Sequence, residues 1–251
     1  MKKDNYSPLM YVIGVFLLFA FWELFSRFYD SSLIFPGPIP VISELLRLLK
    51  DPRFLSSLAN TFFRVIAAMV ISVPLGLTFG IITGLDKRTG SFFQPLFSLI
   101  SATPVMSIIL IAFLFLGSER TPIFTAFLMV FPVMTVNSAE GIRRVDPQLI
   151  EQFNTYKMSK QEALKYLYIP SIAPFVLGGL QSSLSLSWKV VVAAEVLVQP
   201  FRSLGTGMQN ARSRLETTEL FAWTLVTVIA AAMLQGVLSL IVQLLKKRGS
   251  Y

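Results

Sequence analysis

The chain has 251 residues, 54% hydrophobic and 14% charged, with a mean hydropathy of +0.65; this excludes an ordinary soluble domain and is typical of a protein that crosses a membrane several times. It has no Cys and no His, which excludes disulfides, metal sites built on these residues and imidazole catalysis. Its net charge of +8 comes without a basic patch interleaved with aromatic residues, so we expect contacts with anionic lipid and no binding of nucleic acid.

The first predicted element is an apolar run from Leu9 to Trp22, preceded by Lys2 and Lys3. A signal peptide would end in a small-x-small cleavage site, but the residues that follow, Phe19 to Phe25, are bulky. We therefore expect an uncleaved first membrane span.

Hydrophobic segments recur along the chain, each near the ~20 residues that a helix needs to cross the hydrocarbon core. Six are readable: Pro8–Phe28, Leu58–Leu85, Phe92–Leu116, Pro122–Ser138, Ile172–Val198 and Leu220–Leu245. An even number places both termini on one side. With that side inside, the inner segments carry twelve Lys and Arg against eight in the outer segments. This bias predicts a multi-pass protein with both termini in the cytoplasm.

The first outer loop, residues 35–57, opens with a turn at Phe35–Pro38. The following residues, Val41–Lys50, form an amphipathic pattern that predicts a helix lying at the membrane interface. We favour a simple interfacial anchor, and a contact for an external protein is the alternative.

Two features inside the predicted bundle concern helix packing. Gly76, Gly80 and Gly84 recur at every fourth position of the second span, a spacing that allows a close approach of another helix. Pro104 lies in the third span, beside Ser101, and removes a backbone hydrogen bond. Freed backbone groups at membrane depth must face protein or a polar cavity, so this bend lines a translocation path or is a packing kink.

The fifth span carries a polar and aromatic stripe at steps of three and four residues. Its members are Gln181, Ser185, Trp188, Val192, Glu195 and Gln199. Lys189 lies beside the stripe near mid-span, where a charge costs about 2.5–3.5 kcal/mol and should face a cavity or a partner. We interpret Ser185, Trp188, Lys189 and Glu195 as part of a translocation path, with a structural ion pair as the alternative for Lys189.

The polar stretch 138–171 between spans four and five is the most informative feature of the chain. Asp146-Pro147 is one helix start, and Ser159 with Glu162 three residues later is a capping box. Two short amphipathic helices are therefore predicted, with exposed apolar residues that suit a protein contact. The first helix presents Leu149, Ile150 and Phe153, and the second presents Leu164, Leu167 and Tyr168.

This stretch resembles the cytoplasmic loop of permeases of ATP-binding cassette (ABC) importers. The family signature is Glu-Ala-Ala, three residues, Gly, nine residues, Ile, one residue and Leu-Pro. Glu151 and Pro170 match it, Leu167 and Ile169 are conservative replacements, and Gln152, Phe153 and Lys157 depart from it. Ser159 fits the serine often found after the glycine.

Other segments are similar to the nitrate, sulfonate, taurine and thiamine-precursor branch of that family. They are Val73–Gly76 before Gly80, Asp146-Pro147, and Ser187-Trp188 through Val192–Glu195, so the resemblance runs from about Phe35 to Val242. It implies an all-α membrane protein of about six transmembrane helices, with a cytoplasmic coupling-helix loop between spans four and five. One permease domain would cover residues 1–251: an N-terminal span (1–34), the outer loop (35–57) and a core (58–245) that contains the loop 138–171.

The resemblance also implies partners and a mechanism. Two permease copies, here expected to be a homodimer in a bacterial plasma membrane, form the path, and an external solute-binding protein delivers the solute. The loop docks on a cytoplasmic ATPase dimer, through residues that here are Leu149, Ile150, Glu151, Phe153, Lys157, Ser159 and Pro170. The chain lacks a Gly-x-x-x-x-Gly-Lys-Ser/Thr loop, so it is expected not to be an enzyme, to bind no cofactor or metal, and to leave ATP and Mg to the partner ATPase.

Two other functions were weighed. A secondary transporter or channel without an ATPase is the alternative, but such transporters usually show internal repeats that we do not find between the halves of this chain. An intramembrane enzyme is disfavoured because no paired acids lie in the spans. The solute is expected to be a sulfonate-, nitrate- or taurine-like anion, suggested by Lys189, or a thiamine-precursor-like ring that stacks on Trp188.

Overall fold

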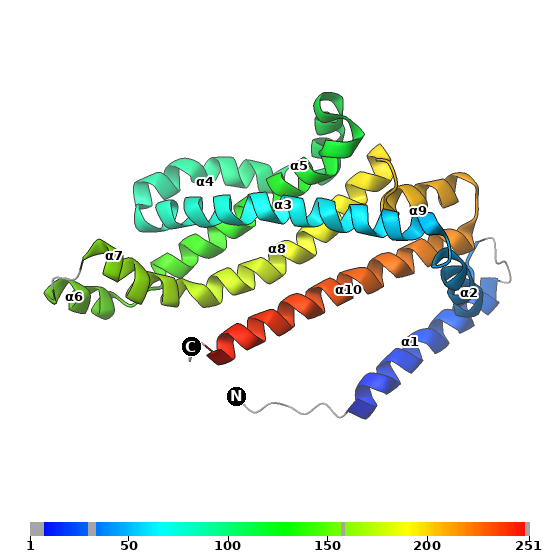
Figure 1. The fold of residues 1–251 in the computed structure, drawn as a ribbon, viewed down its shortest axis with the longest axis horizontal. Helices are drawn as coiled ribbons and strands as arrows, with labels where there is room; N and C mark the ends of the chain where they lie inside the picture. Colours follow the sequence, from blue (N-terminus) through cyan, green and yellow to red (C-terminus); the bar gives the residue numbers. More distant parts are fainter. Residues whose placement is uncertain (1–7, 30–33, 157–158, 249–251) are drawn as a thin grey trace.

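The computed structural model describes residues 8–29, 34–156 and 159–248, and that part of the chain contains helices and no strand (Figure 1). The elements are α1 (Pro8–Tyr29), α2 (Pro38–Leu48), α3 (Pro52–Leu85), α4 (Lys87–Ala102), α5 (Val105–Arg143), α6 (Pro147–Thr155), α7 (Lys160–Ala163), the π-helical η1 (Leu164–Tyr168), α8 (Ile169–Val198), α9 (Leu204–Ser213) and α10 (Thr217–Arg248). Five helical stretches in the described residues are long and apolar enough to cross a membrane. The predicted all-α membrane fold is confirmed.

The third predicted span, Phe92–Leu116, differs from the prediction because it is not one helix. α4 ends at Ala102, Thr103 and Pro104 take extended backbone conformations, and α5 begins only at Val105. Proline lacks an N–H and keeps the residue before it out of the helical region, so the expected kink is a complete break. The 16 residues of α4 are too few to count as a span on their own.

α5 joins the end of the third predicted span to the fourth. It is helical from Val105 to Arg143 except at Gly117, which turns the chain with φ 68° and ψ 179°. A positive φ is readily adopted only by a residue without a side chain. In Figure 1, α4 and the first part of α5 together run from the end of the bundle near α6 toward the end near α9, and the rest of α5 returns. The two pieces thus complete the pass that the sequence assigns to one span.

The other passes follow the predicted order. α3 and α10 run toward the end of the molecule that carries α6 and α7, and α8 runs away from it (Figure 1). α1 starts and α10 finishes toward that same end.

The centre of the bundle is α5, which packs along both α3 and α8. The glycines of α3 face α5 so closely that a Cβ at Gly76 would lie 2.5 Å from Met134 Cβ, and one at Gly80 would lie 2.4 Å from Ser138 Cβ. Real Cβ atoms do not approach so closely, so only glycine fits. The close packing predicted from their spacing is confirmed.

α1 and α2 lie at the side of this bundle. Most of the described residues of α1 are exposed, and Trp22 near its end donates from Nε1 to the Pro36 carbonyl at 3.0 Å. α2 packs against α10 and buries Val41 and Leu48. α2, the helix expected at the membrane interface, therefore packs part of its apolar face against α10.

Candidate functional site

The polar stretch between α5 and α8 folds into the two predicted short helices. α6 begins after Asp146, whose carboxylate accepts from the Gln148 N–H at 2.8 Å. Before α7, the Glu162 carboxylate accepts from the Ser159 N–H at 2.8 Å, and the Ser159 hydroxyl accepts from the Glu162 N–H at 3.3 Å. These reciprocal bonds are the predicted capping box, so both helix starts are confirmed.

The residues predicted to dock on a partner lie on the outside of α6. Leu149 and Glu151 are exposed, and Ile150 and Phe153 are half-buried. α6 has nine residues, and its exposed and half-buried apolar side chains can contact another protein while the helix keeps its packing against the rest of the chain.

Three further loop residues have different surroundings. Pro170 is half-buried in the first turn of α8, and Lys157 lies outside the described residues. Leu167, expected to be exposed for a contact, lies in the π-helical turn η1 and is instead buried at 4% exposure. Among the apolar residues predicted for the second helix, Leu164 is exposed and Tyr168 is half-buried.

The second half of the loop passes into the membrane span without a break. α7, η1 and α8 form one continuous helix from Gln161 to Val198. α7 is therefore joined to α8 by helix and not by a loop.

The polar stripe predicted on α8 is buried only in part: Trp188, Val192 and Glu195 are buried, Ser185 is half-buried, and Gln181 and Gln199 are exposed. Trp188 is 4% exposed and packs edge-on against Phe62 of α3, with 5.2 Å between the ring centroids. Glu195 is completely buried. Both were expected on a translocation path, whereas in this structure they are buried between helices and have no open surface for a solute.

Glu195 is held by a network of donors from two elements, α3 and α9. It accepts from Thr61 Oγ1 at 2.9 Å, from Arg64 Nη1 at 3.0 Å and from the Gly205 N–H at 3.3 Å. Thr61 Oγ1 in turn accepts from the Leu204 N–H at 3.1 Å. The close approach of α9 to α8 requires the glycine, since a Cβ at Gly205 would lie 2.5 Å from Glu195 Cβ.

Arg64 extends this network to the turn of α5. Its Nη2 donates to Glu119 Oε2 at 2.7 Å, and Glu119 Oε1 accepts from the Phe201 N–H at 2.6 Å. Sequence reasoning missed Arg64 and Glu119. A signal was present, because Arg64 is the one charged residue between Leu58 and Leu85, and a lone charge in a span needs a partner.

The remaining path residues lie on exposed surfaces. Lys189 is exposed and pairs with no carboxylate in the described part of the chain, and Ser185 is half-buried. Ser101 is exposed at the end of α4, and Pro104 is exposed where α5 begins. These residues, unlike Trp188 and Glu195, are open to water, lipid or a second copy.

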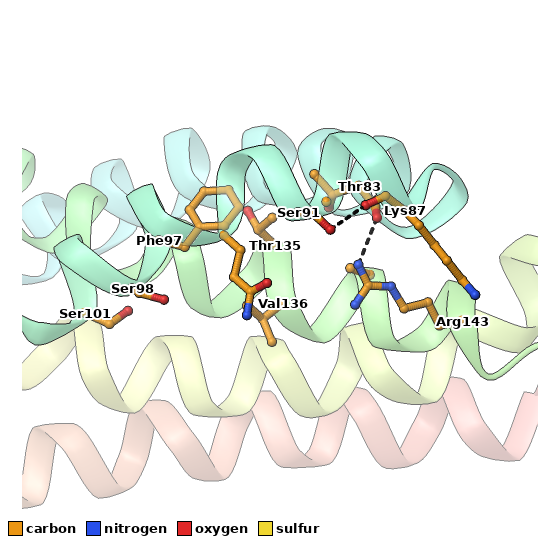
Figure 2. Close-up of a pocket in the computed structure, with 12 residues that line it drawn as sticks. Thr83, Lys87, Ser91, Phe97, Ser98, Ser101, Thr135, Val136 and Arg143 are labelled. Atoms are coloured by element: carbon orange, nitrogen blue, oxygen red, sulfur yellow. Dashed lines mark hydrogen bonds between the residues drawn. The ribbon is translucent and has the colours of Figure 1, made fainter.

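A cavity of about 560 Å³ lies between α4 and the neighbouring parts of α3 and α5. Figure 2 shows Lys87 and Arg143 at one end and Ser98 and Ser101 at the other. Its lining residues are Thr83, Lys87, Gly90, Ser91, Gln94, Phe97, Ser98, Ser101, Thr135, Val136, Ala139 and Arg143. The described residues contain no cluster of three or more His, Cys, Asp or Glu that would hold a metal.

Comparisons with known proteins agree on the kind of protein that this chain resembles. A family model described as "Binding-protein-dependent transport system inner membrane component" matches residues 72–250. The taurine transport system permease protein TauC of Escherichia coli (strain K12) is 26% identical over 225 residues, which are 87% of this chain and 82% of TauC. The formylaminopyrimidine transport permease protein ThiX of Halalkalibacterium halodurans is 24% identical over 186 residues, 74% of either chain.

A solved structure supports the fold. The structure entitled "Crystal structure of an amino acid ABC transporter with histidines" superposes with a TM-score of 0.60 and covers 78% of this chain and 94% of its own. The two sequences are 19% identical, so this likeness concerns the fold alone.

Proposed function

The chain belongs to the family of binding-protein-dependent transport system inner membrane components, and we propose that it is the permease subunit of an ATP-driven importer for a small solute. Its relatives TauC and ThiX are named as permeases of transport systems, for taurine and for formylaminopyrimidine. The importer would lie in a bacterial plasma membrane, with the loop that contains α6 and α7 in the cytoplasm.

The observation that carries the proposal is the loop between α5 and α8. It presents Leu149, Glu151 and Phe153 on a short helix and then continues into a membrane span without a break. A permease needs these two properties together, because a contact on the loop must move the helices that line the path. The site supports force transmission and offers no catalytic group.

The energy source would be a separate chain. The sequence has no Gly-x-x-x-x-Gly-Lys-Ser/Thr loop with which to hold nucleotide phosphates. ATP and Mg would therefore bind to a cytoplasmic ATPase dimer that docks on α6. An external solute-binding protein would meet the opposite end of the bundle, which carries α2 and α9 (Figure 1).

Two copies of the chain would form the path, most simply as a homodimer. The single chain leaves Ser101 on α4 and Lys189 on α8 exposed, and both lie in segments that the sequence predicts to span the membrane. Contact with lipid would cost free energy for each of them, so they are better placed at a hydrated interface between two copies. Trp188 and Glu195 would support that path from behind as positioning residues.

The docking role is tested by co-purification with the ATPase encoded beside this chain. Glu151→Lys and Phe153→Asp should each abolish stable association, because they introduce a charge of the wrong sign or bury one in the contact. Glu140→Lys is the matched control, since Glu140 is also exposed but lies in α5, outside the two short helices α6 and α7. Normal association of both loop variants, or equal loss in the control, would contradict the assignment.

A further inference from the structure

We propose that the cavity between α3, α4 and α5 binds the anionic group of the transported solute, so that this permease is selective for oxyanions such as sulfonates. The inference rests on the proposed function in one respect: it takes the bound anion to be the solute that the permease transports. The cavity itself, and its charge, follow from the lining residues (Figure 2).

The lining carries positive charge that its own residues do not neutralise. Lys87 and Arg143 are two of the twelve lining residues, and none of the twelve is a carboxylate. Neither cation forms an ion pair with any carboxylate in the described part of the chain. Arg143 donates one N–H to the Thr83 carbonyl at 3.0 Å. This bond orients the guanidinium and leaves its other N–H donors available.

The rest of the cavity supplies neutral donors. Gln94, Ser98 and Ser101 recur at steps of four and three residues, so they lie on one face of α4. Their side chains make no hydrogen bond within the described part of the chain. A face of unpaired amide and hydroxyl groups that runs from the two cations to the other end of the cavity suits the passage of an anion with several acceptor oxygens (Figure 2).

The cavity also reaches deep enough to belong to a transport route. Lys87 opens α4 and Ser101 lies fourteen positions later, which corresponds to about 21 Å along the helix axis. The hydrocarbon core is about 30 Å thick, so a polar face of this length is longer than the thickness of one leaflet. A surface site for a lipid head group would not need hydroxyls at the far end.

The backbone of the site is shaped around the cation. A Cβ at Gly90 would lie 2.7 Å from Arg143 Nη2 and 2.9 Å from the Thr83 carbonyl oxygen. Glycine at this position therefore lets α4 come close to the guanidinium. Asp86, which precedes α4, is occupied in capping that helix, and hydrogen bonds from Thr89 and Arg88 lower the pKa of its carboxyl.

The native absence of cysteine permits a direct test of charge selectivity. Full-length Ser91→Cys protein in phosphatidylcholine nanodiscs would be labelled with an anionic sulfonatoethyl and a cationic trimethylammonioethyl methanethiosulfonate. We expect the anionic reagent to be favoured over the cationic one, relative to their rates with free cysteine. Ser91 lines the cavity one helical turn after Lys87, and its neighbour Gly90 lies beside Arg143 Nη2. Added Lys87→Gln or Arg143→Gln should each lower the anionic rate by about threefold, the effect of one unit charge about 7 Å away in a water-like medium.

The control is Arg120→Gln, which removes an exposed cation of α5 that lies outside the cavity lining and 23 positions before Arg143. It should leave the rate ratio unchanged, and Lys87→Arg should retain the preference. An equal fall in Arg120→Gln, or no preference in Ser91→Cys itself, would overturn the proposal.

Protection separates a soluble solute from lipid. Taurine or nitrate should slow labelling more than chloride at equal ionic strength. Protection that arises only when phosphatidylglycerol is added to the nanodiscs would assign the site to a lipid head group and contradict the inference. If the ATPase still co-purifies while charge selectivity is absent, the anion site fails and the permease function stands.

Discussion

At the scale of single residues, the pair Arg64 and Glu195 decides how α3, α8 and α9 fit together. Their side chains are 6% and 0% exposed, and they meet at 3.0 Å. A buried charge is tolerated only with a partner, so removal of one partner costs more than the pair itself contributes. Thr61 and the Gly205 N–H satisfy the rest of the Glu195 carboxylate, which makes the site fully hydrogen-bonded.

Arg64→Met should destabilise the folded protein by about 3–5 kcal/mol, because it leaves Glu195 buried without its cation. Arg64→Met combined with Glu195→Met should cost less than the sum of the two single changes. The midpoint and enthalpy of unfolding in detergent measure both effects. Glu119→Gln is the control: the Glu119 side chain is 56% exposed, so its loss should cost about 1 kcal/mol or less. Equal losses in Arg64→Met and Glu119→Gln would show that burial of the pair is unimportant.

At the scale of helices, the contact between α3 and α5 depends on the absence of side chains at every fourth position. Gly76, Gly80 and Gly84 allow the α3 backbone to lie against Met134, Ser138 and Ile142. In a bilayer the hydrophobic effect does not drive helices together. Van der Waals contact between closely packed helices therefore supplies much of the free energy of their association. The spacing alone predicted this contact but not the helix on the other side.

Gly80→Ala should therefore weaken the bundle by about 1–3 kcal/mol, since its Cβ would lie 2.4 Å from Ser138 Cβ and 2.7 Å from the Thr135 carbonyl oxygen. Gly178→Ala in α8 is the matched comparison, because nothing lies within 4 Å of its Cβ. That change should be neutral or stabilise by about 0.5–1 kcal/mol through the higher helix propensity of alanine. Thermal unfolding of both variants in the same detergent gives the comparison, and a stable Gly80→Ala protein would refute the packing argument.

At the scale of the whole molecule, sequence patterns predicted what depends on neighbours along the chain. The capping box at Ser159 and the apolar segments are local signals, and both are found in the structure. The break at Pro104 was expected only as a kink, since the sequence does not show whether helical hydrogen bonds resume across a proline. The ion-pair partner of Glu195 could not be inferred from the sequence, because Arg64 is 131 positions away along the chain.

Trp188 and Lys189 illustrate the same limit for the transport path. They are adjacent in sequence and were assigned to one surface, yet successive positions on a helix point about 100° apart. Trp188 consequently packs inside the bundle, and Lys189 lies on its exposed side. Which of the two is exposed follows from how α8 packs against α3 and α5.

Lys189→Met should reduce solute uptake by about tenfold, the loss expected for one charge-assisted hydrogen bond to an anion. Association with the ATPase should persist, because Lys189 is far along α8 from the docking loop. Uptake is measured in membranes that contain the chain, its ATPase and its binding protein, with Lys50→Met in the first outer loop as the control. Undiminished uptake by Lys189→Met would remove this residue from the path.

The unbroken helix from Gln161 to Val198 joins the second half of the loop to the far end of α8 as a single rod. Its 38 residues correspond to a length of about 57 Å, longer than the hydrocarbon core is thick. A tilt of about 10° about its first turn would displace its last turn by about 10 Å, several times the length of a hydrogen bond. Glu195 lies in that last turn and is bonded to Thr61 and Arg64 of α3, so a tilt of this size would separate α8 from α3 at the buried carboxylate.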